Sequence, residues 1–285
     1  MVEIEVTNEA TRATGFVGRF FTSWRLALGE LVIVSLGVLI ALWADQAIQA
    51  RQEAAMAVSY LERLRADLNA DIESLRFSSR QARNRLAITR QVDAWMNDLG
   101  AAPDPDSLVI NAHYAGVVFS PTISRFTIEE LKSTGDLRLL NNQVLKRKIG
   151  DYYNQIGLQI DQWTRWGDEG ITETYFRELA FVLDPESRIR AGTIDPSLLQ
   201  QFLKASGEGA PSSLVELQQS TIEIGVTRTD ADRILDQMRS RPNFAGYLRD
   251  SMYWAHLSTQ LWDGVAISAK ELDAAIAKEL EALRK

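Results

Sequence analysis

The sequence predicts an all-α protein with one membrane-crossing helix near its N-terminus. Apolar residues recur every three or four positions over most of the chain, which is the period of a helix. Almost no segment alternates polar and apolar residues with the period of two that a half-buried strand shows. Residues 31–44 form an uncharged apolar run. We therefore expect a transmembrane helix that continues into a long helix, followed by a helical bundle outside the cytoplasm.

Composition limits the chemistry of the chain. Its 285 residues carry a net charge of −7, whereas nucleic-acid binding needs clustered Lys and Arg, so we expect no nucleic-acid partner. There is no cysteine, which excludes disulfides, thiolate catalysis and Cys-based metal sites. No Gly-rich phosphate loop, nucleophile elbow or His-Glu-x-x-His motif occurs. We expect no bound cofactor or metal and no enzymatic activity.

The membrane helix is expected over residues 26–44. Trp24 and Trp43 lie 19 positions apart, or about 28 Å of helix, and Trp prefers the two edges of a hydrocarbon core about 30 Å thick. Phe16 and Phe20 precede Trp24 at the same four-residue spacing, and with the two Trp residues they form the expected interface belt. The segment around them is either a short helix lying in the interface or an extension of the membrane helix.

The orientation follows from the charges around the span. Arg12, Arg19 and Arg25 precede it, whereas only Arg51 closely follows it. The positive-inside rule then places the short segment 1–25 in the cytoplasm and residues 45–285 outside it. No small-x-small cleavage site follows closely, so we expect an uncleaved signal anchor in a bacterial inner membrane, with a periplasmic domain.

One face of the span combines a carboxylate with small residues. Glu30, Val34, Gly37, Ala41 and Ala44 fall on a single helical stripe. Small residues four apart let two helices approach closely, and a carboxylate in a span usually faces protein or water. The stripe therefore predicts association with a second copy or with another membrane protein. The alternative is that Glu30 reaches back to water at the membrane edge.

Caps and breakers divide residues 45–285 into helices. We expect a long helix to about Leu99, with a possible bend near 77–79, and a possible linker near 205–211. Asp184-Pro185 is expected to stop a helix. The other expected helices run from Asp104-Pro105 to about Val118, from Ser120-Pro121 to Gly135 with a capping box at Thr127 and Glu130, from Asn141 or Asn142 to about Val182, from Ser197 to Lys204 behind Asp195-Pro196, from a capping box at Ser213 and Glu216 to about Arg239, and from Asn243 onward.

A few side chains in this domain could carry chemistry. Glu129, Glu130 and Asp136 are conceivable metal ligands, but acids at helix starts usually complement the helix dipole. His113 and His256 are more simply packed residues than bases. Four tryptophans on two expected helices either line a small-molecule pocket or pack in the core, and we favour the core. They are Trp163, Trp166, Trp254 and Trp262.

Two segments resemble a bacterial family of uncharacterised single-pass membrane proteins. The first is Gly29-Glu30-Leu-Val-Ile-Val-Ser-Leu-Gly37-Val-Leu-Ile-Ala41-Leu, followed by a long charged helix. The second is Leu131-Lys-Ser-Thr-Gly135-Asp-Leu-Arg-Leu-Leu-Asn-Asn with Ile149-Gly-Asp-Tyr152-Tyr153. The resemblance covers roughly residues 20–160 and departs from the family after Leu42. It implies an anchored helical domain and brings no catalytic residues.

Three functions fit these features. The first is a membrane-anchored interaction protein or accessory subunit of an inner-membrane assembly, whose partners are the lipid bilayer and either a second copy or another membrane protein. The second is an extracytoplasmic sensing or ligand-binding module that signals through a partner, because a cytoplasmic segment of about 25 residues cannot hold an output domain. The third is an anchored enzyme. We favour the first.

Overall fold

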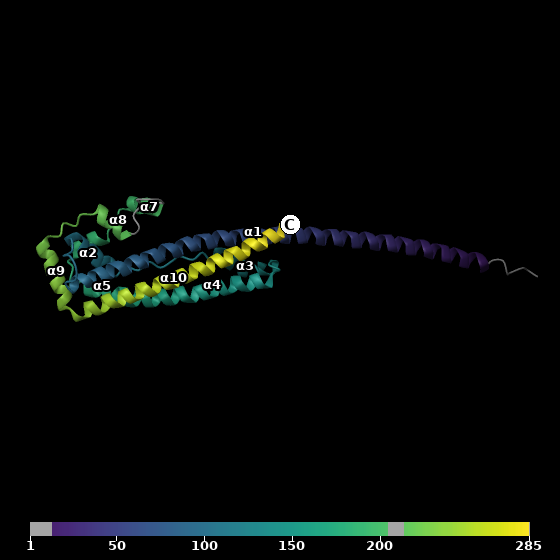
Figure 1. Ribbon diagram of the computed structural model, residues 1–285. Coiled ribbons are helices and arrows are strands. Elements are labelled where there is room, and N and C mark those ends of the chain that lie inside the picture. Colours follow the sequence, from purple (N-terminus) through teal and green to yellow (C-terminus); the bar gives the residue numbers. More distant parts are fainter. Residues whose placement is uncertain (1–12, 205–213, 285) are drawn as a thin grey trace, which may run out of the picture. The chain divides into compact units, whose positions relative to one another are not determined.

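The computed structural model describes residues 13–204 and 214–284, with side chains from Leu31 onward apart from positions 168, 169, 198, 201, 203 and 204 (Figure 1). These residues form helices and no strand, so the all-α prediction is confirmed. The elements are α1 (Ala13–Met96), α2 (Pro105–Tyr114), α3 (Phe126–Ser133), the 3-10 helix η1 (Asp136–Leu139), α4 (Gln143–Trp163), the π-helix η2 (Thr164–Thr172), α5 (Glu173–Leu179), α6 (Pro185–Gly192), α7 (Pro196–Lys204), α8 (Leu214–Thr221), α9 (Arg228–Ser240) and α10 (Pro242–Leu283).

The chain divides into two compact units, Met1–Val58 and Ser59–Lys285, and α1 contributes to both. The prediction that the apolar helix continues into a long helix is confirmed, because α1 is helical without interruption from Ala13 to Met96. The stretch 77–79, where a bend was considered, stays α-helical. The possible linker 205–211 and the expected cap Ser213 lie outside the described residues.

Three long helices form the frame of the second unit: α4, α10 and the part of α1 that begins at Ser59. Figure 1 shows α4 and α10 side by side along this part of α1. Four leucines of α1 recur every three, four or seven residues and are at most 1% exposed, as their helical spacing predicts. They are Leu61, Leu64, Leu68 and Leu75.

Polar bonds fasten α1 to α10 along this frame. The Arg65 guanidinium donates to the Asp273 carboxylate, with Nε 2.8 Å from Oδ1. Further along both helices, the Ser79 hydroxyl donates to Asp263 Oδ1 at 2.6 Å. Ser79 breaks the apolar seam of α1 in the sequence, and this bond is how its buried hydroxyl is satisfied.

A second cluster of buried residues forms where α2, α5, α6, α8 and α9 pack around the start of α10. Tyr175 and Phe244 belong to this cluster, and both are fully buried, with ring centroids 5.5 Å apart. The Tyr175 hydroxyl donates to the Ala112 carbonyl at 2.7 Å. Gly116 is required here, because a Cβ at this position would lie 2.4 Å from the Tyr175 ring.

Three predicted helix starts, each with an N-cap side chain close in sequence, are confirmed. The Asp104 carboxylate accepts from the Ser107 amide at 2.9 Å at the start of α2. Asn142 Oδ1 accepts from the Val144 and Leu145 amides at the start of α4. The amide of Ser197 donates to Asp195 at the start of α7. In each case the side chain satisfies an amide that the first helical turn leaves without a partner.

The helix expected from Ser120-Pro121 is wrong. Residues 117–125 are not helical, and α3 starts only at Phe126. The amides of Thr122 and Ser124 donate to Ser74 and Asp71 of α1, at 2.8 and 2.7 Å, and these bonds hold the segment along α1. We call residues 116–125 the strap. The capping box at Thr127 and Glu130 is also absent, because α1 supplies the partners of both residues, Asp67 for the Thr127 amide and Arg63 for Glu130.

The helix expected from Asn141 or Asn142 to about Val182 is confirmed, because residues 143–179 are helical without a break. Its middle is the π-helix η2, which separates α4 from α5. Gly167 and Gly170 lie in η2, and glycine weakens a regular helix. The Thr172 and Thr174 hydroxyls bond to these glycine carbonyls, at 3.3 and 2.7 Å, and compete with the regular backbone pattern. Asp184-Pro185, expected only to stop a helix, also caps and begins α6.

The helix expected from Ser213 to Arg239 is two helices, α8 and α9. The segment between them contains Gly225 with φ of 81°, which a regular helix cannot accommodate. The Asp106 carboxylate of α2 accepts from three successive amides of this segment, those of Ile224, Gly225 and Val226, at 2.8–3.1 Å. A carboxylate 118 residues away therefore breaks the helix, and Thr227 caps the next one.

Candidate functional site

The apolar part of α1 in the first unit is exposed on every side. Its large apolar side chains from Leu31 to Leu42 are 53–71% exposed, and Trp43 of the interface belt is 72% exposed. An 18-residue window here reaches a mean hydropathy of 2.1, and none of it is buried. Among the described residues, this helix is the one long and apolar enough to cross a membrane.

Four of the five residues predicted for helix packing have described side chains. Val34 is 64% exposed, and Ala41 and Ala44 are exposed on the same helical stripe. A Cβ added to Gly37 would meet no atom within 4 Å. Glycine inside a helix costs about 0.5–1 kcal/mol relative to alanine, and no contact of the described chain requires it here. Glu30 lies in α1, but its side chain is outside the described residues.

The other belt residues are also helical without described side chains. Phe16, Phe20 and Trp24 lie within α1, which favours extension of the apolar helix over a separate element at this point. The structure describes the side chain of one belt residue, Trp43. Where the remaining three aromatic rings lie stays a prediction of the sequence.

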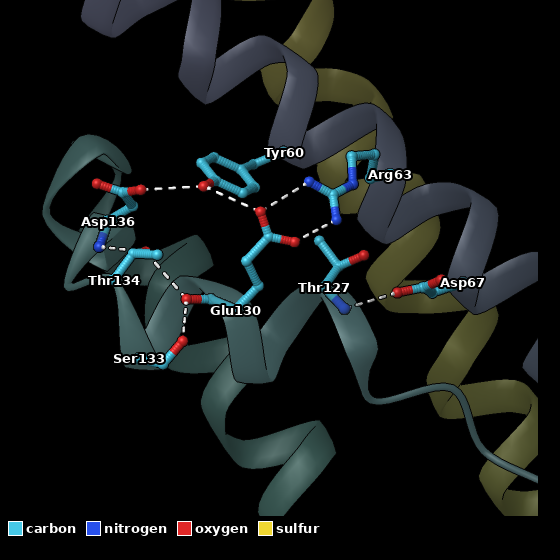
Figure 2. Close-up of polar contacts among 8 residues, drawn as sticks. All are labelled: Tyr60, Arg63, Asp67, Thr127, Glu130, Ser133, Thr134 and Asp136. Carbon is cyan, nitrogen blue, oxygen red and sulfur yellow. Dashed lines mark hydrogen bonds and ion pairs between the residues drawn. The ribbon is translucent and has the colours of Figure 1, made fainter.

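A polar cluster joins α1, α3 and η1 in the second unit (Figure 2). Tyr60 and Arg63, one helical turn apart on α1, point toward Glu130 of α3 and Asp136 of η1. The Tyr60 hydroxyl lies 2.9 Å from Asp136 Oδ2 and 3.4 Å from Glu130 Oε1. Both terminal nitrogens of Arg63 donate to the Glu130 carboxylate, which gives a bidentate pair. We call these four residues the Glu130 cluster.

The charged and polar groups of the Glu130 cluster stabilise the contact of α1 with α3 and η1. The hydrogen bond from Arg63 lowers the pKa of Glu130, and the same bond raises the pKa of the Arg63 guanidinium. The hydrogen bond to Asp136 raises the pKa of the Tyr60 phenol. These shifts keep Tyr60, Arg63 and Glu130 in their ordinary charge states, whereas catalysis needs a group poised to change its charge. Two of the three acids considered as metal ligands, Glu130 and Asp136, are therefore engaged by α1, whereas Glu129 is exposed on α3. No group of three His, Asp or Glu that could hold a metal occurs among the described residues.

A buried carboxylate lies further along α1. Asp71 is fully buried and accepts from the Ser124 amide at 2.7 Å and from the Tyr152 hydroxyl of α4 at 3.2 Å. Burial raises the pKa of Asp71 to about 6, although both hydrogen bonds act in the opposite direction. Burial also raises the pKa of Tyr152 and of its neighbour Tyr153. Asp71 thus joins α1, the strap and α4 at one point.

The two histidines are placed differently. The His113 ring packs against Tyr114 and Phe176, with centroids 5.3 Å from each. Burial, and then the charge of Arg188, lower its pKa to about 4, so the ring is neutral at physiological pH. This fits the packing role expected for His113. His256 is exposed on α10, so the packing role expected for it is wrong.

Three of the four tryptophans form one packed group. Trp163 of α4 lies 4.6 Å from Trp254 and 6.2 Å from Trp262 of α10, between ring centroids. The Trp163 indole donates to the Ser258 hydroxyl at 3.0 Å. Core packing therefore accounts for these three, while Trp166 is 66% exposed and separate from them. A hollow of about 380 Å³ between α4 and α10 is lined by other residues.

Sequence reasoning missed the two polar clusters because their members are 53–81 residues apart. One signal was present: Asp71 interrupts the apolar seam of α1, which marks it as a buried polar residue with a distant partner. No family model, curated protein or solved structure matches the chain. The functional assignment therefore depends on the residues themselves.

Proposed function

We propose that the chain is a membrane-anchored helical interaction protein, an accessory subunit of an inner-membrane assembly. The observation that carries the proposal is the exposure of the apolar helix over residues 31–44 on all sides. A surface of this kind is unfavourable in water, since each Å² of apolar area removed from water stabilises by about 25 cal/mol. Lipid and a partner helix are the two surroundings that satisfy it.

Gly37 supports a partner helix in addition to lipid. Lipid chains place no demand for glycine on a helix, whereas two helices that pack closely do. Gly37 and Ala41 provide the small surface, and Glu30 is the polar group on the same stripe. The described chain leaves this stripe uncovered, so the partner is a second copy or another membrane protein.

We infer that the N-terminus lies in the cytoplasm and the second unit in the periplasm of a bacterial cell. The arginines before the span support this orientation, as does the resemblance of the Gly29-Glu30 segment to anchored proteins with a helical domain. Because the chain has no cysteine, single cysteines test the orientation cleanly. A membrane-impermeant maleimide should label Lys132→Cys in spheroplasts and Thr7→Cys only after the membrane is opened; the reverse pattern contradicts the orientation.

We also infer that the chain is not an enzyme. The residues best suited to chemistry serve structural bonds: Glu130 pairs with Arg63, Asp71 joins three elements, and His113 is packed among aromatic rings. Each of these groups has a stabilising role that explains its presence. A screen of the purified chain for hydrolase activity, with Glu130→Gln and Asp71→Asn as matched controls, tests this inference. Activity that either substitution abolishes would contradict it.

The decisive experiment is purification of the full chain from native membranes in mild detergent, with mass and subunit identity determined together. Recovery with a different membrane protein in a fixed ratio supports the accessory-subunit function and names the assembly. Recovery of the chain alone, as a monomer or as a homo-oligomer, overturns the accessory-subunit function, and the search then moves to ligands of the second unit.

The membrane face is tested by Gly37→Ile. Isoleucine adds bulk where the partner helix is proposed to approach, so the complex should weaken at least about tenfold. Ser35→Ile is the matched control, because it makes a similar change from small to large on the opposite side of the same helix. If both variants keep the complex, the Gly37 stripe is not the contact.

A further inference from the structure

One face of α1 in the second unit is polar, although most of it is buried. Its polar side chains recur every three or four positions, which places them on a single stripe of the helix. Apolar side chains alone cannot cover such a face, because buried polar groups need hydrogen-bond partners. We call this face the polar stripe of α1, and four of its members are at most 5% exposed. It consists of Asp67, Asp71, Ser74, Ser78, Gln81 and Arg85.

The strap lies along the polar stripe and is held by its side chains. Three backbone amides, two of the strap and one just after it, each donate to one acceptor of the stripe. The pairs are Thr122 with Ser74 at 2.8 Å, Ser124 with Asp71 at 2.7 Å, and Thr127 with Asp67 at 3.3 Å. Within the described residues, positions 121–124 take part in no backbone–backbone hydrogen bond. Few bonds therefore need to break for this part of the strap to lift from α1.

The strap also covers a polar group that has no partner. Residues 117–119 enclose a cavity of about 10 Å³ with Gln81 and Arg85 of the polar stripe. Gln81 Nε2 is buried and has no hydrogen-bond partner among the described residues. A buried donor of this kind costs free energy, whereas water satisfies it when the strap lifts. The hydration of Gln81 therefore favours the open strap.

Asp71 is the fastening whose strength depends on protonation. It is fully buried, and it joins the strap to the Tyr152 hydroxyl of α4, which lies 3.2 Å from its Oδ2. The titratable groups that face it are Asp67 of α1 and, on α4, Tyr152 and Tyr153. Arg125, the charged side chain of the strap, lies over α4 instead. An ionised Asp71 is therefore a buried charge beside a second acid, and no cation of the described residues acts on it.

The hydrogen bonds to Asp71 do not compensate for its burial. Burial raises the pKa of Asp71 to about 6, although the bonds from Ser124 and Tyr152 lower it, and the charge of Asp67 also raises it. A carboxyl group that water reaches has a pKa of about 3.9. Between these two values the carboxyl group ionises more readily when the strap is lifted than when it is closed, so a rising pH favours the open strap.

We propose that the strap is a pH-sensitive cover of the polar stripe of α1, which is closed in acid and opens more often as the pH rises to neutrality. Lifting the strap lets water reach an ionised Asp71 and removes part of the cost of the buried charge. A protonated Asp71 carries no such cost and keeps an oxygen that accepts from the Ser124 amide. The open state presents the polar stripe and residues 117–119 to the solvent, a surface that the closed strap hides.

Hydrogen exchange of the full chain in detergent, followed by mass spectrometry, tests the proposal. After correction for the pH dependence of chemical exchange, the protection of peptides covering residues 118–127 should fall at least about tenfold between pH 4 and pH 7. Peptides of α10 around the buried Leu272 should be far more protected. Low concentrations of urea should accelerate exchange in α10 but not in the strap, because opening of the strap exposes little surface.

Three variants separate the titration of Asp71 from the loss of a hydrogen bond. Asp71→Asn keeps an acceptor for the Ser124 amide and should abolish the pH dependence of protection in the strap. Asp67→Asn removes the neighbouring charge, so the fall in protection should end at a lower pH. Ser74→Ala is the matched control, because it removes a fastening that does not titrate: the Thr122 amide should exchange faster at every pH, with an unchanged pH dependence. Helix content by circular dichroism verifies folding.

Three outcomes overturn the proposal. One is protection in the strap equal to that in α10, which means that the strap opens only when the second unit unfolds. A second is corrected protection that is the same at pH 4 and at pH 7. A third is a pH dependence that persists in Asp71→Asn, which assigns it to another group. The accessory-subunit function is tested separately, since all residues of this proposal belong to the second unit.

Discussion

Two stretches of the same helix, α1, place their leucines in opposite surroundings. Between residues 31 and 44 every large apolar side chain is more than half exposed. In the second unit, Leu61, Leu64 and Leu68 are at most 1% exposed. The first stretch is apolar all around the helix, whereas the second has one apolar stripe among charged residues.

The difference shows what each stretch requires from its surroundings. A single apolar stripe is covered by two helices of the same domain, and its charged remainder stays in water. A helix that is apolar all around has no such division, so the chain itself does not supply its environment. One part of α1, from Ser59 onward, therefore contributes to the core of the second unit, whereas the apolar part over residues 31–44 requires surroundings that the chain does not provide.

The largest expected effect comes from the same substitution in the two stretches. Leu68→Ala removes a fully buried side chain and should lower the free energy of unfolding of the second unit by about 2–5 kcal/mol. Leu39→Ala, at a position 61% exposed, should leave that free energy unchanged. Urea unfolding of the full chain in detergent, followed by circular dichroism, measures both. Equal losses in the two variants would remove the distinction between the stretches.

The next effect concerns the polar residue within the buried stripe. The pKa of Asp71 is raised from 3.8 to about 6 by burial, so the folded chain binds more protons than the unfolded chain between these values. Its contribution to stability is therefore fully present below pH 3.8 and is lost as the pH rises through 6. The loss should be about 1–3 kcal/mol.

Asp71→Asn isolates this contribution. Asn keeps an acceptor for the Ser124 amide and does not titrate. The stability of the variant, relative to the unchanged chain, should therefore rise between about pH 4 and pH 7 by the amount that the carboxylate loses. Unfolding curves at several pH values measure this difference. A difference that does not vary with pH would show that Asp71 does not titrate in this range.

The sequence predicted those features that neighbouring residues determine. Asp104, Asn142 and Asp195 cap helices through amides two or three positions away, so their chemistry is legible locally. The leucine stripe of α1 was predicted for the same reason, since its period is set within one helix.

The sequence did not predict features that distant residues determine. Asp106 breaks the helix expected after Ser213 from 118 positions away, and Asp71 holds the strap where a helix was expected. The hollow between α4 and α10 is of the same kind, because the residues that line its two sides are more than 100 positions apart. The apolar periodicity of a segment identifies which face of its helix is buried. It does not identify the partner of that face, which depends on the tertiary packing of residues distant in the sequence.

The smallest expected effect is that of the Glu130 cluster, and its pH dependence has the opposite sign to that of Asp71. The hydrogen bond from Arg63 lowers the pKa of Glu130 below 4.5. Its stabilisation is therefore present above pH 4.5 and is lost as the pH falls through the lowered value. Glu130→Gln should lower the melting temperature at about pH 7 by less than Leu68→Ala does, because the ion pair is partly exposed. The difference in melting temperature between Glu130→Gln and the unchanged chain should shrink toward zero in acid. The destabilisation caused by Asp71→Asn should instead be largest in acid, where protonated Asp71 stabilises the unchanged chain. If Glu130→Gln lowers the melting temperature equally at neutral pH and in acid, the Glu130 side chain stabilises the fold by packing. In that case the pH dependence of stability would not distinguish the partly exposed Glu130 cluster from the buried Asp71.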